Sequence, residues 1–354
     1  MDDTNEKCLY LTFNQDSSLF CIGTNLGFRV YNSFPLKCVG KRDIQGGIGI
    51  IEILNSTNIF AFVGTGENPQ FGPNKVILWD ELHQKVVNQL IVSSNVKNIK
   101  IKRTKIFIIE EDKIKVFTLG NYEKIDSLKT YVNRNGIFGI SLEPKLNIIA
   151  YPSPDIGKII IKDYDNKKDG NFNVNCINAH KNEIIALVMN YDGSLIASAS
   201  EKGTIIKIFK TKDGTLLQEL RRGTEPAEIY SLVFNINSKY IACSSNKGTV
   251  HIFNIKNDQT NENETKNQKS FLGNVVSYIG IQNEYLNSEW SFAKYRLPNK
   301  EKNIASFTKE SDDTIIVITI DGKYYQSKFD DKTVSECQTC FEEEILKMET
   351  EKKE

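Results

Sequence analysis

The chain has 354 residues, of which 40% are hydrophobic and 25% are charged, and its 45 basic and 45 acidic residues cancel. A net charge of zero argues against a general attraction to nucleic acid or to anionic membranes, so any electrostatic binding has to come from a local patch. No apolar run reaches the roughly 18 residues of a spanning helix, and the polar start MDDTNEKC is unlike a secretory signal. We therefore expect a cytoplasmic protein.

The seven cysteines fit that expectation. Cys21 and Cys243 lie in apolar, strand-like runs, where small buried residues are common. Cys337 and Cys340 form one isolated C-x-x-C pair, and tetrahedral zinc would need two further ligands that the neighbouring sequence does not offer. We predict neither a metal site nor a cofactor.

One unit recurs along the chain, and its most regular part is a β-branched strand that follows a polar or glycine turn. This strand reads GFRVYN at 27, KVILWD at 75, KIKVFTL at 113, GKIIIKDYD at 157, GTIIKIF at 203, GTVHIF at 248 and GKYYQSKF at 322. The first six starts are 38 to 48 residues apart, and the last gap is 74 residues. A four-stranded propeller blade repeats about every 40–45 residues, so the spacing predicts seven blades with one insertion of about 30 residues before the last.

We predict an all-β fold, a seven-bladed β-propeller with degenerate WD40-type blades, because only Trp79-Asp80 supplies a WD dipeptide at the signature position. One propeller domain would cover residues 1–340, and the charged segment 341–354 would be a tail that is mobile or forms a short frayed helix. A pair of β-sandwiches is the alternative fold. We reject it because its strands would not repeat at near-constant spacing.

Two neighbouring arginines, Arg221 and Arg222, precede Gly223 after the fifth repeated strand. On an extended segment, neighbouring side chains point to opposite faces. The two arginines therefore cannot both bind the same partner. We expect their side chains to diverge toward separate pockets on adjacent blades.

The segments around the arginines carry a family resemblance. They read INAHKNEIIALVMNYDGSLIASASEKGTIIKIF at 177–209, SSNKGTVHIF at 244–253, FNQD at 13–16 and NKVILWD at 74–80. With L-R-R-G at 220–223, they resemble the PROPPINs, phosphoinositide-binding β-propellers that include the WIPI proteins of autophagy. The resemblance covers about residues 8–330. Leu220 replaces the usual Phe of the motif, and Lys207 stands where many relatives carry Arg, which trades a bidentate fork for a point charge.

The resemblance implies two phosphoinositide pockets. The first would be formed by His180, Ser198, Ser200, Thr204, Lys207 and Arg221, and the second by Arg222, Ser244, Ser245, Thr249 and His251. Hydroxyl and imidazole groups can donate to phosphate and inositol oxygens, and a guanidinium can add paired, charge-assisted bonds.

Each feature also has a structural reading. An Arg-Arg-Gly turn is commonly a solvated connector, and Ser and Thr in WD-type strands often satisfy backbone groups. His180 matches a histidine that WD blades use in an internal hydrogen-bond network. Their co-occurrence at corresponding positions of adjacent repeats favours the pockets, and the family resemblance supplies most of that preference.

The insertion covers 256–290. Its first part, KNDQTNENETKNQK, is polar and predicted to be disordered, whereas its second part is rich in apolar and aromatic residues. In PROPPINs the loop between the third and fourth strands of blade six inserts into the bilayer. The resemblance thus implies membrane insertion by Tyr278, Ile279, Ile281, Tyr285, Leu286 and Trp290. The alternative is that these residues cover blade six or seven.

No P-loop, nucleophile elbow, zinc-protease motif or dinucleotide fingerprint is present, so we do not expect an enzyme. The resemblance implies a monomeric adaptor for phosphatidylinositol 3-phosphate and 3,5-bisphosphate. It would attach peripherally to autophagosome-precursor, endosomal or vacuolar membranes and recruit autophagy proteins such as a lipid-transfer scaffold. The alternative is a WD40-type protein scaffold that binds acidic or phosphorylated peptides without lipid. Nucleic acid is not an expected partner.

Overall fold

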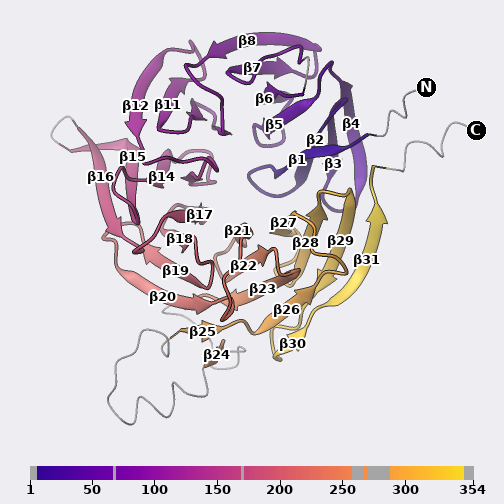
Figure 1. Cartoon of the computed structure of the whole chain (residues 1–354), viewed down its shortest axis with the longest axis vertical. Coiled ribbons are helices and arrows are strands. Elements are labelled where there is room, and N and C mark those ends of the chain that lie inside the picture. Colours follow the sequence, from indigo (N-terminus) through magenta and orange to yellow (C-terminus); the bar gives the residue numbers. More distant parts are fainter. Residues whose placement is uncertain (1–5, 67–68, 169–170, 257–266, 270–287, 347–354) are drawn as a thin grey trace, which may run out of the picture. The chain divides into compact units, whose positions relative to one another are not determined.

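The computed structural model describes residues 6–66, 69–168, 171–256, 267–269 and 288–346. In these ranges the regular structure consists of β-strands gathered in seven sheets (Figure 1). No helix long and apolar enough to cross a membrane is found among them. The chain divides into two compact units, Met1–Ile137 with Ile316–Tyr325 and Glu342–Glu354, and Phe138–Ile315 with Gln326–Phe341.

The first unit holds three antiparallel sheets of four strands each. Sheet 1 contains β1 (Cys8–Phe13), β2 (Leu19–Thr24), β3 (Gly27–Asn32) and β4 (Lys37–Asp43). Sheet 2 contains β5 (Ile48–Ile53), β6 (Ile59–Gly64), β7 (Lys75–Asp80) and β8 (Lys85–Ile91). Sheet 3 contains β9 (Asn98–Ile101), β10 (Lys105–Ile109), β11 (Lys113–Thr118) and β12 (Lys124–Lys129).

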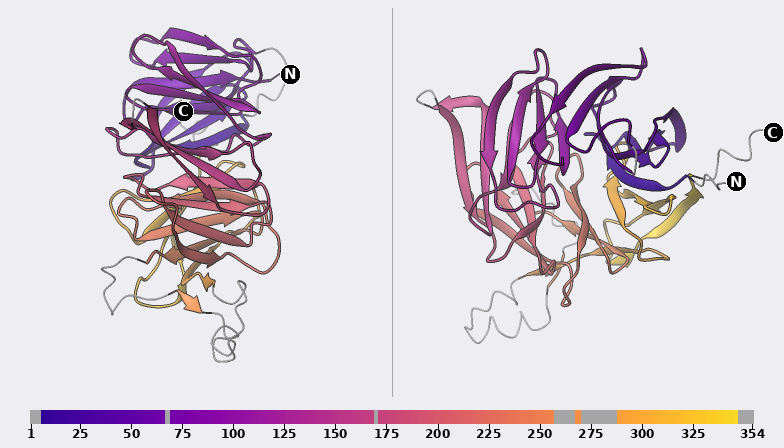
Figure 2. Two further views of the ribbon diagram at one scale, coloured as in Figure 1. Left: turned by 90° about the vertical axis from the view of Figure 1, so that its left-hand side faces the viewer. Right: turned by 45° about the horizontal axis from the view of Figure 1, so that its top comes forward.

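The second unit holds sheets 4, 5 and 6. Sheet 4 contains β13 (Gly139–Ile140), β14 (Ile148–Pro152), β15 (Lys158–Lys168) and β16 (Asn171–Asn178). Sheet 5 contains β17 (Ile184–Met189), β18 (Leu195–Ser200), β19 (Ile205–Lys210), β20 (Leu216–Arg221), β25 (Glu289–Trp290) and β24 (Gln268–Lys269). Sheet 6 contains β21 (Ile229–Phe234), β22 (Tyr240–Ser245), β23 (Thr249–Asn254), β26 (Ala293–Arg296) and β30 (Ser335–Glu336). The β15–β16 hairpin has the longest strands of these sheets (Figure 2).

Sheet 7 contains β27 (Asn303–Phe307), β28 (Thr314–Thr319), β29 (Lys323–Lys328) and β31 (Gln338–Glu344). Its last strand, β31, extends into residues 341–354, which the sequence analysis assigns to a tail. Four residues beyond 340 belong to β31, and Ile345 is buried, with its N–H donating to the Gly322 carbonyl at 2.8 Å. The regular structure therefore ends later than the predicted boundary, because the apolar Ile345 is drawn into the core.

All seven predicted strands are third strands of their sheets, namely β3, β7, β11, β15, β19, β23 and β29. Their β-branched content follows from burial on both faces. On β7, Ile77 packs with sheet 1, whereas its neighbours Val76 and Leu78 pack with sheet 3. A strand sandwiched between two sheets needs apolar residues at consecutive positions instead of a strict alternation with polar ones.

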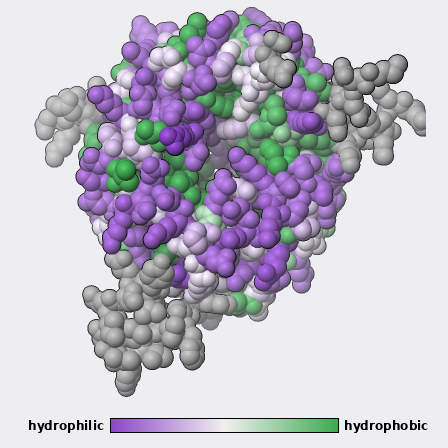
Figure 3. Space-filling view, in the orientation of Figure 1, coloured by the Kyte–Doolittle hydropathy of each residue, from purple (hydrophilic) through white to green (hydrophobic). Residues whose placement is uncertain are grey.

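The same rule orients the strands of sheets 5 and 6. Ile206, Ile208 and Leu220 share one core cluster with Ile241 and Cys243 of β22. This face of sheet 5 therefore turns to sheet 6, and residues one position along the strands turn the other way. Hydrophilic residues predominate on the surface seen in Figure 3, where hydrophobic residues gather in small groups.

Candidate anion-binding crevices on sheets 5 and 6

The arginine pair stands where sheet 5 ends. Arg221 is the last residue of β20, opposite Ile205 in register, and the Arg222 N–H donates to the Thr204 carbonyl at 2.9 Å. The two side chains have separate partners. The Nε of Arg221 donates to Ser288 Oγ at 2.8 Å, and the Nε of Arg222 donates to the Gly203 carbonyl at 2.9 Å.

Both arginines are almost fully buried, with 3% of Arg221 and 4% of Arg222 exposed. Burial lowers the pKa of Arg222, against the attraction of the Glu225 carboxylate, but an arginine keeps its charge over the whole physiological range. Within the described part of the chain, Arg222 donates to the backbone carbonyls of Gly203 and Glu225. Neutral acceptors satisfy the N–H groups without cancelling the charge, so Arg222 remains a source of positive potential.

Gly203 places one of these carbonyls. Its φ of 59° is in the left-handed region, and a Cβ on it would lie 1.9 Å from the Ala227 carbonyl oxygen. Only glycine fits this turn without strain. The turn before β19 therefore presents a carbonyl to Arg222 because the sequence has Gly at this position.

A row of polar side chains crosses sheet 5 on one face. Ser198 lies opposite Lys207, and Lys207 lies opposite Glu219, with Lys207 Nζ 3.0 Å from Glu219 Oε1. Directly opposite residues of an antiparallel pair share a face, as do residues two apart on one strand. Ser200 and Arg221 therefore belong to the face of this row, away from sheet 6. Of the residues predicted for the first pocket, Ser198, Ser200, Lys207 and Arg221 thus share one face, and Glu219, which was not predicted, lies among them.

His180 and Thr204 complete the first set in different ways. His180 Nε2 is 2.9 Å from Ser198 Oγ, and burial, reinforced by the charge of Lys207, lowers its pKa to about 4. His180 is therefore neutral near pH 7. Thr204 precedes β19, and its carbonyl accepts from Arg222, so its backbone contact is with the second arginine instead of the first.

The second row lies on sheet 6. His251 is opposite Cys243 on β22 and opposite Lys294 on β26, and Thr249 is opposite Arg296. Ser245 is two residues from Cys243 and shares its face, which turns to sheet 5. Arg222, one position beyond Arg221, also turns to this side. Ser245, Thr249, His251 and Arg222 therefore gather between sheets 5 and 6.

Ser244 is separated from this group. It stands between Cys243 and Ser245 on β22, so alternation turns its side chain to the opposite face, where its buried Oγ has no hydrogen-bond partner in the described residues. The sequence grouped Ser244 with the second pocket because both serines follow the same apolar run. In register, Cys243 is the counterpart of Ser198, and Ser244 is the counterpart of Ala199.

Three cations lie near His251 in the second row. Burial lowers the pKa of His251 to about 3, and the charges of Lys294, Arg222 and Arg296 add to this shift. His251 is thus neutral, and its Nδ1 is 3.0 Å from Ser291 Oγ. Lys294 and Arg296 were not among the predicted residues. They follow the insertion in the sequence, and only the pairing of β23 with β26 brings them to His251.

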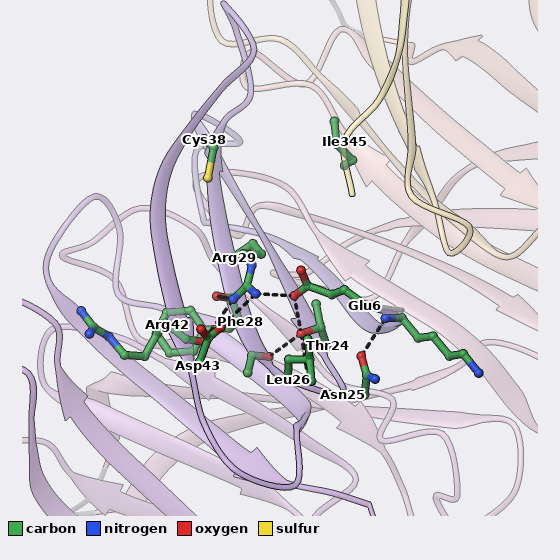
Figure 4. A network of polar contacts seen from close by, with 12 residues as sticks. Glu6, Thr24, Asn25, Leu26, Phe28, Arg29, Cys38, Arg42, Asp43 and Ile345 are labelled. Carbon is green, nitrogen blue, oxygen red and sulfur yellow. Dashed lines mark hydrogen bonds and ion pairs between the residues drawn. The ribbon is translucent and has the colours of Figure 1, made fainter. Parts of the chain in front are cut away.

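Sheet 1 has a different charge pattern at the corresponding positions (Figure 4). By repeat, Arg29 corresponds to Lys207, and Asp43 to Arg221. Arg29 Nη2 lies 2.7 Å from Glu6 Oε1 and 2.9 Å from Asp43 Oδ1, and Thr24 Oγ1 donates to the same Glu6 oxygen at 2.8 Å. Arg29 of sheet 1 is therefore matched by two carboxylates of the chain itself. In sheets 5 and 6, Lys207 pairs with Glu219 and Arg296 pairs with Glu336, whereas the hydrogen bonds described above for Arg221 and Arg222 go to neutral acceptors.

The predicted membrane residues are mostly outside the described part of the chain. These are Tyr278, Ile279, Ile281, Tyr285 and Leu286. Trp290 is described and lies in β25, beside β20, with its ring centroid 5.8 Å from the guanidinium carbon of Arg221. It thus belongs to the base of the insertion and contacts Arg221 of the first row.

Comparison with known proteins identifies the family of this chain. The PROPPIN family profile matches residues 7–345. The chain belongs to the PROPPIN family. Over 328 residues it is 34% identical to Autophagy-related protein 18e of Arabidopsis thaliana, covering 92% of this chain and 84% of the relative. It is 31% identical to SVP1-like protein 2 of Saccharomyces cerevisiae over 360 residues, covering 91% and 79%.

The solved structure of Kluyveromyces lactis Hsv2 superimposes with a TM-score of 0.77 at 24% identity, covering 96% of this chain and 99% of that one. The predicted fold class, a seven-bladed β-propeller, is confirmed, and each sheet is one blade. The predicted family is also confirmed, and with it the place of this PROPPIN among autophagy-related proteins. In the described part of the chain, no cluster of three or more His, Cys, Asp or Glu residues could hold a metal ion.

Proposed function

We propose that this PROPPIN is a non-enzymatic adaptor that binds phosphatidylinositol 3-phosphate and 3,5-bisphosphate in two crevices. The first crevice lies on the Lys207 face of blade five and uses Arg221, and the second lies between blades five and six and uses Arg222. The observation that carries the proposal is the separation of the arginine pair, since each guanidinium has its own partners on its own side of β20.

The charges of the second crevice suit a phosphorylated headgroup. Arg222, Lys294 and Arg296 all act on His251, which is held neutral beside Ser291. Cations attract the phosphates, while neutral imidazole and hydroxyl groups can bond inositol oxygens without repulsion. A phosphoinositide headgroup offers both kinds of acceptor.

Membrane attachment would combine these crevices with the insertion that leaves blade six between β23 and β26. Each contact can be weak, because a second contact on the same molecule acts at high effective concentration. The exposed Lys181 and Lys202 near the first crevice would each add about 1 kcal/mol at an anionic surface. Peripheral attachment of this kind would bring autophagy partners, such as a lipid-transfer scaffold, to the membrane.

Co-flotation with vesicles tests the proposal. Wild-type protein should float with vesicles containing phosphatidylinositol 3-phosphate and remain at the bottom with phosphatidylcholine alone. The double variant Arg221→Thr with Arg222→Thr should lose flotation. Its matched control, Lys41→Thr with Arg42→Thr, removes two adjacent positive charges from β4 and should float like the wild type.

Equal flotation of the Arg221→Thr, Arg222→Thr variant and the wild type would contradict the proposal. A wild type that fails to float but binds an acidic phosphopeptide would favour the protein-scaffold alternative. Circular dichroism and thermal unfolding of each variant are needed beside flotation, because Arg222 also bonds two backbone carbonyls.

A further inference from the structure

The described ends of the blade-six insertion meet in a small polar neck. Asn267 follows the first part of the insertion, and its side chain bonds the backbone of Asn254 twice, accepting from the N–H at 2.8 Å and donating to the carbonyl at 2.7 Å. β24 then pairs antiparallel with β25, and β25 pairs parallel with β20 of blade five (Figure 1). The neck therefore joins the end of β23 in blade six to the outer strand of blade five.

Glu289 is the centre of this neck. Only 9% of the residue is exposed. Its Oε2 accepts from Gln218 Nε2 at 2.8 Å and from Asn267 Nδ2 at 3.1 Å, and its Oε1 lies 2.5 Å from Lys256 Nζ. Gln218 also accepts from the Lys256 N–H at 3.1 Å. A buried carboxylate is stable only when such partners replace its water, so the four side chains hold one another in place.

These bonds keep Glu289 charged. Burial alone raises the pKa of its carboxyl group, but the bonds from Lys256, Asn267 and Gln218 outweigh burial and leave the pKa below its usual value. The neck thus depends on a negative charge close to a crevice that we propose to bind anions. By charge alone, this residue opposes binding.

The two neighbours of Glu289 touch Arg221. Ser288 accepts from Arg221 Nε at 2.8 Å, and the Trp290 ring lies 5.8 Å from its guanidinium carbon, in range for a cation–π contact. Trp290 and Arg221 are also directly paired in register. Because Ser288 and Trp290 flank Glu289 on an extended segment, both turn to one side while Glu289 turns to the other. Fixing Glu289 therefore fixes both contacts on Arg221.

We infer that Glu289 is a positioning residue for the first crevice, which acts through Ser288 and Trp290 to hold the Arg221 guanidinium in place for an anionic headgroup. The inference deepens the proposed function and rests on it for the identity of the ligand. Glu289 links the base of the insertion to Arg221, so the geometry of the first crevice depends on the structure of the neck.

Whether Glu289→Gln weakens or tightens headgroup binding distinguishes a positioning role of Glu289 from a purely electrostatic one. In an Arg222→Thr background, which leaves the first crevice, binding of soluble inositol 1,3-bisphosphate is measured by isothermal titration calorimetry. Adding Glu289→Gln should weaken binding roughly tenfold, the loss expected when one charge-assisted bond is no longer properly held. Bare electrostatics requires the opposite, since a negative charge has been removed.

The matched control is Glu219→Gln, which removes another carboxylate beside the crevice but outside the neck. It frees Lys207 and should tighten binding a few-fold. Asn267→Ala loosens the neck without changing the charge and should weaken binding in the same direction as Glu289→Gln. If Glu289→Gln tightens binding as Glu219→Gln does, or if Asn267→Ala leaves the affinity unchanged, the positioning role is wrong.

Fluorescence tests the neck without any ligand. The chain has only two tryptophans, so Trp79→Phe leaves Trp290 as the single reporter. In that background Glu289→Gln should shift Trp290 emission to longer wavelength and increase its quenching by acrylamide. Unchanged emission would overturn the inference. If the wild type binds no headgroup, the proposed function is wrong. The fluorescence result would still test the role of Glu289 in the neck.

Discussion

Arg221 and Arg222 differ in what holds them. Arg221 is contacted by Ser288 and Trp290 from the insertion, whereas Arg222 is held by backbone carbonyls of its own blade and of the turn that follows it. A guanidinium with fixed neutral partners is pre-organised, so less entropy is lost when a phosphate binds it. The pair therefore serves two sites with two different supports.

The support of Arg222 gives a stability prediction. Lysine keeps the charge but cannot reach both carbonyls with a planar fork. Arg222→Lys should lower the free energy of unfolding by about 1–2 kcal/mol, as expected for lost bonds to a charged donor. Urea denaturation without ligand measures the change. Unaltered stability would mean that the carbonyl bonds contribute nothing.

Two histidines, the half-buried His180 and the buried His251, give a pH prediction. Their folded pKa values, about 4 for His180 and about 3 for His251, lie below the ordinary value of 6.5. As the pH falls below 6.5, the unfolded chain takes up protons that the folded chain excludes, so the folded state loses stability toward pH 4. The melting temperature should therefore fall from pH 7 to pH 4.5. His180→Gln should reduce this slope, and an identical slope would contradict the assignment.

At the scale of single residues, the repeat places Lys207 and His251 at matching positions of two units, each opposite a residue of the second strand of its own sheet. The sequence analysis missed Glu219. This residue lies two positions before Arg221, so the alternation of side chains along a strand would have placed it on the same face. The sequence analysis could not find Lys294 and Arg296, since only strand pairing across the insertion reveals them.

At the scale of the strand, β22 shows how register decides function. Ser244 and Ser245 are adjacent and both fully buried, yet they turn to opposite faces. Sequence similarity between repeats could not separate them, because the S-A-S of β18 and the C-S-S of β22 look alike until each is aligned with its partner strand.

This pair of serines offers a matched test. Ser245→Ala should weaken headgroup binding at the second crevice several-fold, measured by calorimetry in an Arg221→Thr background. Ser244→Ala should leave that affinity unchanged. Because the buried Oγ of Ser244 has no partner in the described residues, Ser244→Ala should also be neutral or slightly stabilising. Weakened binding by Ser244→Ala alone would show that the strand faces have been assigned the wrong way round.

At the scale of the whole molecule, the repeat explains most of the fold. The seven strands of similar sequence are the third strands of the seven sheets. Their sequences are similar because each strand is buried between neighbouring sheets and needs apolar residues on both faces. The sequence placed the end of the fold too early because β31 and Ile345 are preceded and followed by charged residues. Contacts distant in sequence hold them in place: the Tyr31 hydroxyl donates to the Ile345 carbonyl at 3.2 Å, and the Ile345 N–H donates to the Gly322 carbonyl at 2.8 Å.

The late boundary predicts a sensitive C-terminus. A chain that ends after residue 340 loses the second half of β31 and the buried Ile345, and should melt several degrees lower than the full chain. A chain that ends after Leu346 keeps both and is the matched control. Differential scanning calorimetry compares them, and equal melting temperatures would show that the predicted boundary at 340 was correct.

The number of headgroups bound per chain is the most direct measurement of the two-crevice arrangement. Calorimetric titration with soluble inositol 1,3-bisphosphate should give two sites for the wild type and one each for Arg221→Thr and Arg222→Thr. A single site in the wild type, or complete loss of binding in either single variant, would contradict the separation of the arginines into two independent crevices.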